Sequence, residues 1–174
     1  MSINISNIKK LDKFEDFKKV FNAVFSEFPF FESWTEEEIR ETYNLNQKEG
    51  IIFGYYNWED CLGFISMRNH HRYEHPIDFK GKKSIYISHI AVLPKYRHNG
   101  IASALVPYAL DFATNLGYEY AYLRLNDDFP MGLGIAKRNE FVRDFKVCQE
   151  VTHSRTHKRS RKPDDLRVFM FKEL

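Results

Sequence analysis

The stretch SIYISHIAVLPKYRHNGIASAL, residues 84–105, decides the fold. It begins as a strand in which Ile85 and Ile87 alternate onto one face. The next apolar pair is Ile90 and Val92, so the step from Ile87 is three residues rather than two. Such a slip in the alternation of faces is what a β-bulge produces. The stretch therefore predicts a bulged strand, with a slightly irregular core strand as the simpler alternative.

The predicted bulge has consequences for the backbone and for the side chains around it. Backbone groups near residues 89–91 lose their ladder partners, which frees them to bind an extended, amide-bearing ligand as if it were another strand. Tyr86 and Ser88 face the side opposite Ile85 and Ile87. We therefore expect Tyr86 and Ser88 to line a reaction cleft.

The strand is followed by the turn RHNGIA, residues 97–102, and then by a helical pattern. The first backbone N–H groups of a helix have no partner within it, and the helix dipole adds partial positive charge at that end. Gly100 lets a ligand approach the backbone, and Arg97 adds a formal charge. Together these features predict an anion site suited to a diphosphate. The chain has neither a GK[ST] nor a G-x-G-x-x-G motif, which argues against an ATP or GTP site and against a Rossmann site.

The composition predicts a globular protein with a single domain over residues 1–174. The net charge of +2 is too close to zero for a dedicated nucleic-acid binder. The chain has two cysteines and no CxxC pair, which favours a reducing compartment and a cytoplasmic protein. It begins without the apolar core of a signal peptide and has no apolar stretch long enough to span a membrane, so we expect no membrane partner.

Apolar periodicity predicts a mixture of strands and helices along the chain. Alternation predicts strands at residues 3–8, 51–57, 61–69, 84–92, 120–126, 142–151 and 166–174. Helical spacing predicts a helix within residues 11–28, whose apolar positions run from 14 to 25, and helices from 36 to about 47, over 101–116 and over 130–141. The first two helices are each expected to begin with a capping pair, Asp12 with Glu15 and Thr35 with Glu38.

The segment IAVLPKYRHNGIASAL, residues 90–105, resembles the acyl-CoA-binding motif of the GNAT superfamily of N-acetyltransferases. The pattern V-x-P-x-x-R-x-x-G-x-(G/A) is met by Val92, Pro94, Arg97, Gly100 and Ala102. The order of elements resembles that fold throughout, whereas strong motif identity is confined to residues 85–126. The resemblance implies an α/β (α+β) fold with a mixed, mostly antiparallel sheet of six to seven strands, flanked by helices and splayed between the fourth and fifth strands.

The resemblance also implies an activity and a cofactor site. Family members move an acetyl group from acetyl-CoA to an amine by direct attack in a ternary complex, without a metal. The pantetheine arm of coenzyme A would be held by Ile90, Ala91 and Val92. The diphosphate would be held by Arg97, His98, Asn99, Gly100, Ile101 and Ala102. Asn126 matches a family asparagine near the cofactor.

One segment departs from the family pattern. The family often continues with A-L-Y-x-x-x-G-F, whose tyrosine protonates the departing thiolate. Here the segment is GIAKRNEF, residues 134–141, so Ala136 takes the tyrosine position and Glu140 replaces the glycine. A CoA-binding regulatory module with weak or no catalysis is therefore the alternative to an acetyltransferase.

Candidate catalytic side chains come from the bulged strand itself. Tyr86 and Ser88 match positions at which some family members carry the base or its water relay. Because the pKa of an unperturbed tyrosine is about 10, we expect Tyr86 and Ser88 to order a water rather than to act as bases. His89 titrates in a useful range, but we expect it to pack at the bulge.

Three other segments each have two interpretations. The histidines of HHRYEH, residues 70–75, invite a metal site, but an exposed loop is expected and no metal is predicted. The basic run 153–162 suggests nucleic-acid binding, but a solvated connection between strands is expected. The aromatics of residues 28–34 either shape the acceptor pocket or pack in the core. The predicted acceptor is a small-molecule or peptide amine, and a homodimer is left open.

Overall fold

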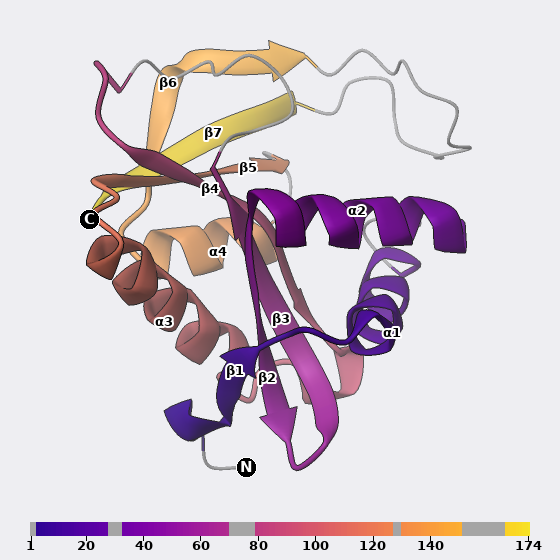
Figure 1. The fold of residues 1–174 in the computed structure, drawn as a ribbon. Coiled ribbons are helices and arrows are strands. Elements are labelled where there is room, and N and C mark those ends of the chain that lie inside the picture. Colours follow the sequence, from indigo (N-terminus) through magenta and orange to yellow (C-terminus); the bar gives the residue numbers. More distant parts are fainter. Residues whose placement is uncertain (1–2, 28–32, 70–78, 127–129, 151–165) are drawn as a thin grey trace.

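The computed structural model describes residues 3–27, 33–69, 79–126, 130–150 and 166–174. They form a seven-stranded sheet in the order β1-β2-β3-β4-β5-β7-β6 (Figure 1). The strands are β1 (Ile8–Lys10), β2 (Gly50–Asn57), β3 (Asp60–Arg68), β4 (Ser84–Val92), β5 (Tyr120–Asn126), β6 (Val142–Glu150) and β7 (Leu166–Glu173). Among the described strands only β4 and β5 pair in parallel, so the predicted mixed, mostly antiparallel sheet is confirmed.

Helices cover both faces of this sheet (Figure 1). In the described part of the chain they are α1 (Phe14–Phe25), α2 (Glu36–Glu49), α3 (Ile101–Asn115) and α4 (Pro130–Arg138), with short 3₁₀ turns at Ile5–Asn7 and Pro94–Tyr96. Ile85 and Ile87 of β4 pack in one core with α3 and α4. Phe64 of β3 packs in a separate core with α1 and α2, where its ring centroid lies 4.6 Å from that of Phe17. The sheet therefore separates two apolar cores.

The start of α2 follows the predicted capping box. The hydroxyl of Thr35 accepts a hydrogen bond from the N–H of Glu38, and the Glu38 carboxylate accepts one from the N–H of Thr35. The capping pair predicted for α1 is wrong, because the N-cap is Lys13, which makes no side-chain cap hydrogen bond. Of the two helices on this face of the sheet, α2 therefore begins with a capping box and α1 does not.

The predicted strand over residues 3–8 is also wrong in most of its length. The Asn4 side chain accepts a hydrogen bond from the N–H of Ser6 over 3.0 Å, and residues Ile5–Asn7 form a 3₁₀ turn. Asparagine side chains compete in this way for backbone donors and favour turns. Alternation of apolar residues alone does not reveal this competition, and of the predicted strand only Ile8, the first residue of β1, is in a strand.

The predicted bulge lies in β4. Ser66 of β3 is opposite His89, whereas the next residue, Met67, is opposite Ile87. Ser88 is therefore the extra residue of the bulged strand, which confirms the slip that the alternation predicts. Both Ser88 and His89 make side-chain contacts on the α1 and α2 side, Ser88 with Asn46 and His89 with Phe21.

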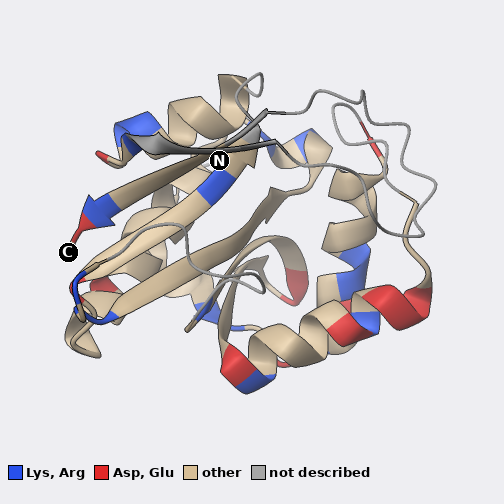
Figure 2. Cartoon of the chain, turned by 90° about the horizontal axis from the view of Figure 1, so that it is seen from above, with Lys and Arg blue, Asp and Glu red and all other residues tan. Residues whose placement is uncertain are grey.

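Charges of both signs lie on several of the described elements, as seen from above in Figure 2. The first turn of α2 is acidic, with Glu36, Glu37 and Glu38. Among the described residues, no helix is both long and apolar enough to cross a membrane. The histidine segment 70–75 and the basic run 153–162 lie outside the described residues.

Candidate active site

The sheet opens between β4 and β5. The two strands pair only from Ser84 to Ile87 of β4 and from Tyr120 to Leu123 of β5. Beyond the bulge β4 runs on to Val92 along β3, and no further pairing with β5 occurs in the described chain. The predicted splay between the fourth and fifth strands is therefore present, and it starts at the bulge.

Two residues of β4 turn their backbone groups toward this opening. The N–H of Leu93 donates to the carbonyl oxygen of Leu62 on β3 over 2.9 Å. Because antiparallel strands bond at every second residue, Ala91 also faces β3, and Ile90 and Val92 face away from it. Two of the three residues predicted for pantetheine thus present amides to the gap, whereas Ala91 contributes its side chain to the core.

The turn after β4 has an unusual backbone. His98 and Gly100 both have positive φ, 62° and 82°. The Asn99 side chain donates to the carbonyl oxygens of Tyr96 at 3.2 Å and Arg97 at 3.1 Å, so it braces the turn from within. An αL residue before a helix redirects successive N–H groups toward one point, which is the geometry of an anion-binding nest.

The mouth of α3 leaves a row of amides available. Its first backbone bond runs from the N–H of Ala104 to the carbonyl oxygen of Gly100, 3.0 Å away. Within the described chain, no hydrogen bond to an acceptor appears for the N–H groups of residues 98–103. A side chain at Gly100 would be strained by its φ, and its Cβ would lie 3.1 Å from the Ile3 side chain. Both the φ and the contact with Ile3 therefore favour glycine here.

Tyr86 lies in a small aromatic cluster on the face that carries α2. Its ring centroid is 5.1 Å from that of Tyr122, and the Arg68 guanidinium lies 5.5 Å from the ring centre. Burial raises the pKa of the Tyr86 hydroxyl, against the opposing effect of Arg124 and Arg68. A raised pKa favours the protonated hydroxyl, which suits a hydrogen-bonding role better than that of a base.

Ser88 belongs to a hydrogen-bond network that sequence reasoning missed. Its hydroxyl donates to Asn46 Oδ1 over 2.6 Å and lies 2.8 Å from the hydroxyl of Ser66. Asn46 and Ser66 are fully buried. A signal was available, because Asn46 stands seven residues after the buried Ile39 and so on the apolar face of α2. A buried asparagine needs polar partners, and β4 supplies one.

His89 packs at the bulge, as expected. Its ring centroid lies 5.6 Å from that of Phe21 and 5.8 Å from that of Phe25, both on α1. Burial lowers the pKa of His89 to about 3, with a smaller effect from Arg68. The imidazole is therefore neutral at pH 7.

The remaining predicted positions are less informative. Asn126 ends β5 opposite Arg167, and its side chain lies outside the described residues. Ala136 is buried in α4, and only 1% of it is exposed. Glu140 has a φ of 63°, the left-handed conformation that a glycine would adopt more easily.

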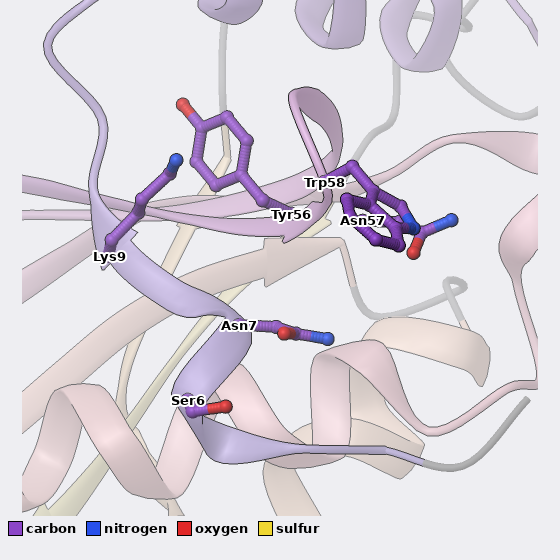
Figure 3. A pocket seen from close by; sticks show the side chains of 6 residues that line it. All are labelled: Ser6, Asn7, Lys9, Tyr56, Asn57 and Trp58. Atoms are coloured by element: carbon purple, nitrogen blue, oxygen red, sulfur yellow. The ribbon is translucent and has the colours of Figure 1, made fainter.

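A separate pocket lies at the β1 edge of the sheet (Figure 3). It is lined by Ser6, Asn7, Lys9, Tyr56, Asn57 and Trp58. The Lys9 ammonium lies 4.2 Å from the centre of the Tyr56 ring. The pocket contains no predicted site residue, so it is distinct from the opening beside β4.

The geometry of β4 and α3 agrees with comparisons to known proteins. The family model described as the acetyltransferase (GNAT) family matches residues 17–130. This chain belongs to the GNAT acetyltransferase family. The match covers the bulged strand, the turn and α3, so the expected family and the enzyme class are confirmed. A comparison with curated proteins gives no match.

Solved structures support the same fold. A putative phosphinothricin N-acetyltransferase is 15% identical with a TM-score of 0.71, covering 96% of this chain and 97% of the other. The ribosomal-protein-S18-alanine N-acetyltransferase from Escherichia coli is 14% identical with a TM-score of 0.69, covering 95% and 92%. A putative acetyltransferase from Salmonella typhimurium, solved with its cofactor acetyl-CoA, is 13% identical with a TM-score of 0.67, covering 95% and 92%. At these identities the likeness concerns the fold.

Proposed function

We propose that this GNAT acetyltransferase moves an acetyl group from acetyl-CoA to a primary amine, by direct attack of the amine within a ternary complex. The observation that carries the proposal is the order of two donor sets along the chain. The outward amides of Ile90 and Val92 are followed, after the 3₁₀ turn Pro94–Tyr96, by the amides of residues 98–103. An extended ligand with amides at one end and a diphosphate at the other matches that order.

The residues present fit coenzyme A. Ile90 and Val92 would bond the pantetheine arm in the manner of a strand, because β5 has diverged at this point. The amides of residues 98–103, with Arg97, would hold the diphosphate, and Gly100 keeps the approach open. Acetyl-CoA would supply the acetyl group as an activated thioester.

The chain would assist the reaction by positioning and by electrostatics. The N–H of Ile90 is the first outward amide after the bulge, and it would stabilise the negative charge that develops on the thioester oxygen. Tyr86 would hold a water or the amine through its protonated hydroxyl, and Ser88 would act through its hydrogen bonds to Asn46 and Ser66. Holding both reactants in the opening removes much of the entropic barrier.

A CoA-binding module without catalysis is the second candidate, and Ala136 favours it. A methyl group buried in α4 donates no proton to a leaving thiolate. Release of CoA thiol with a panel of primary amines separates the two candidates, because the module binds CoA and releases none. Within the described residues no cluster of side chains suited to a metal occurs, and the proposed reaction uses none.

Gly100 offers a direct test of the cofactor site. Gly100→Asp places a negative charge where the diphosphate would lie, and we expect CoA binding to disappear in calorimetry. Gly100→Asn is the matched control, because it has nearly the same shape, the same strained φ and the same contact with Ile3. We expect Gly100→Asn to retain measurable binding. Equal affinity of the two variants for CoA would contradict a diphosphate at this turn.

A further inference from the structure

Four polar side chains behind the bulge form a chain of hydrogen bonds from α2 to β4. The contacts run from Asn46 Oδ1 to the Ser88 hydroxyl at 2.6 Å, on to the Ser66 hydroxyl at 2.8 Å, and on to His89 Nδ1 at 3.1 Å. Each hydroxyl has one proton to donate, so the direction of every bond in the chain depends on the direction of its neighbour.

Asn46 on α2 sets the direction of these hydrogen bonds. Asn46 Nδ2 donates to the backbone carbonyl oxygen of Thr42 over 2.7 Å. A carbonyl oxygen only accepts, so the Asn46 amide cannot be reversed, and its Oδ1 must face Ser88. Oδ1 also only accepts, so Ser88 donates its single proton to Asn46, and the backbone carbonyl oxygen of Ser66, 3.1 Å away, is a second acceptor for the same proton.

The same count of hydroxyl protons determines which nitrogen of the His89 ring is protonated. Because the Ser88 proton is engaged, the 2.8 Å contact between the hydroxyls requires the proton of Ser66. Ser66 then has none left for His89, so the 3.1 Å contact requires a proton on His89 Nδ1. In a neutral imidazole this leaves Nε2 with its lone pair. No described residue makes a hydrogen bond to Nε2.

His89 lies beside the opening in the chain. It stands between the bulge residue Ser88 and Ile90, whose amide faces the opening, and the residue as a whole is partly exposed. The low pKa of His89 keeps the ring neutral, so Nε2 accepts a hydrogen bond without taking the proton. A neutral amine has N–H groups to donate and a lone pair for attack.

We propose that His89 Nε2 accepts a hydrogen bond from an N–H of the acceptor amine, and that Asn46, Ser88 and Ser66 are positioning residues that hold His89 in the Nδ1-protonated tautomer. This inference rests on the proposed function for the identity of its ligand. The bulge then has a role besides exposing the backbone of β4. Its extra residue, Ser88, connects Asn46 to Ser66 and so fixes the direction of the hydrogen bond between Ser66 and His89.

Nitrogen NMR of protein labelled with ¹⁵N-histidine tests the tautomer in the free protein at pH 7. The His89 signals are assigned from their loss in His89→Phe. We expect Nε2 of His89 to be unprotonated and Nδ1 to carry the proton. A proton on Nε2 would overturn the proposal. This NMR measurement needs neither activity nor CoA. Its failure can therefore be distinguished from a failure of the proposed function, which would appear as no CoA binding and no thiol release.

Glycinamide, a small primary amine, tests the ligand in CoA-saturated protein near pH 8. The α-amino pKa is about 7.7–8.0, so about half of such an amine is uncharged there. We expect the His89 Nε2 signal to shift saturably, and an unmoved signal would overturn the amine contact. Ser66→Ala should yield a mixture of tautomers and about tenfold weaker glycinamide binding, whereas Ser66→Thr keeps the hydroxyl and should keep both properties. Equal behaviour of Ser66→Ala and wild type would overturn the role of the chain.

Discussion

Arg97 reaches back from the turn to β4, where its Nε donates a hydrogen bond to the carbonyl oxygen of Val92 over 3.3 Å. Its guanidinium also lies 4.0 Å from the Glu27 carboxylate. In this position the Arg97 side chain covers one of the outward carbonyls that the proposed pantetheine site uses. A bound diphosphate would attract the guanidinium away from Val92. Binding of the diphosphate at the turn would therefore free the Val92 carbonyl oxygen for the pantetheine arm.

Arg97→Ala is expected to weaken CoA binding by about 10-fold to 100-fold, because a hydrogen bond to a charged group contributes about 1.5–3 kcal/mol. Pantetheine, which lacks the diphosphate, should lose no affinity, since removal of Arg97 leaves the Val92 carbonyl uncovered. Calorimetry with both ligands measures the difference. The dependence of CoA affinity on salt should also fall, because a phosphate contact is lost.

Lys95→Ala is the matched control for Arg97. Lys95 is an exposed cation in the same turn, and its ammonium lies 4.9 Å from the centre of the Tyr96 ring. We expect CoA affinity to change by less than about threefold, because exposed charges are screened by solvent. An equal loss in both variants would mean that the turn attracts CoA by general charge and that Arg97 has no specific contact.

Tyr86→Phe is expected to lower turnover about tenfold or more while CoA affinity stays nearly unchanged. The substitution removes only the hydroxyl, and the ring keeps its packing against Tyr122. Because burial raises the pKa of Tyr86, its ionisation should be absent from the pH–rate profile near neutral pH. Tyr122→Phe removes the hydroxyl of the neighbouring ring and serves as control. Unchanged turnover in Tyr86→Phe would remove this residue from the mechanism.

The features that sequence reasoning predicts well are those set by local pattern. The bulge follows from the three-residue step between Ile87 and Ile90. Side chains in a regular strand alternate with a period of two, so an extra residue in the strand is the local explanation for such a step. The turn at Gly100 follows from a residue type that tolerates a positive φ. Both features involve only neighbours in the chain, and they account for most of the proposed cofactor site.

The features that sequence reasoning misses depend on distant contacts. The bond between Asn46 and Ser88 joins residues 42 positions apart, and its polarity depends on a backbone carbonyl of a third residue. Local periodicity places Asn46 on the apolar face of α2, but it does not identify the residues to which Asn46 bonds. The capping pair at Asp12 failed for a related reason: the carbonyl of Asp12 accepts a hydrogen bond from the hydroxyl of Tyr43 on α2, so tertiary contacts shape the entry to α1.

Glu140→Gly is expected to stabilise the protein by up to about 1 kcal/mol. A non-glycine residue at a φ of 63° is strained by about 1–2 kcal/mol, and relief of that strain outweighs the added freedom of the unfolded chain. The lost ion pair with Lys172, 2.8 Å long, contributes little because the Glu140 side chain is 82% exposed. Glu140→Ala keeps the strain and loses the same ion pair, so it should be no more stable than wild type. Urea unfolding compares the three proteins, and a less stable Glu140→Gly would contradict the strain argument.

Acid should destabilise the protein through His89. The unfolded histidine titrates near 6.5, whereas the pKa in the folded protein is about 3, because burial and, to a smaller extent, Arg68 disfavour the charged ring. Between these values the unfolded state binds the additional proton, so stability is complete above pH 6.5 and falls as the pH drops toward 3. The expected loss is up to about 3 kcal/mol between pH 6.5 and 4.

His89→Phe isolates this contribution, because it keeps an aromatic ring against Phe21 and Phe25 but has no proton to bind. All carboxylates titrate in both proteins, so the difference between their unfolding free energies at each pH reports His89 alone. We expect wild type to lose stability relative to His89→Phe as the pH falls below 6.5. Parallel curves from pH 7 to pH 4 would show that His89 takes up a proton in the folded state, and a charged imidazole would have no lone pair for an acceptor amine.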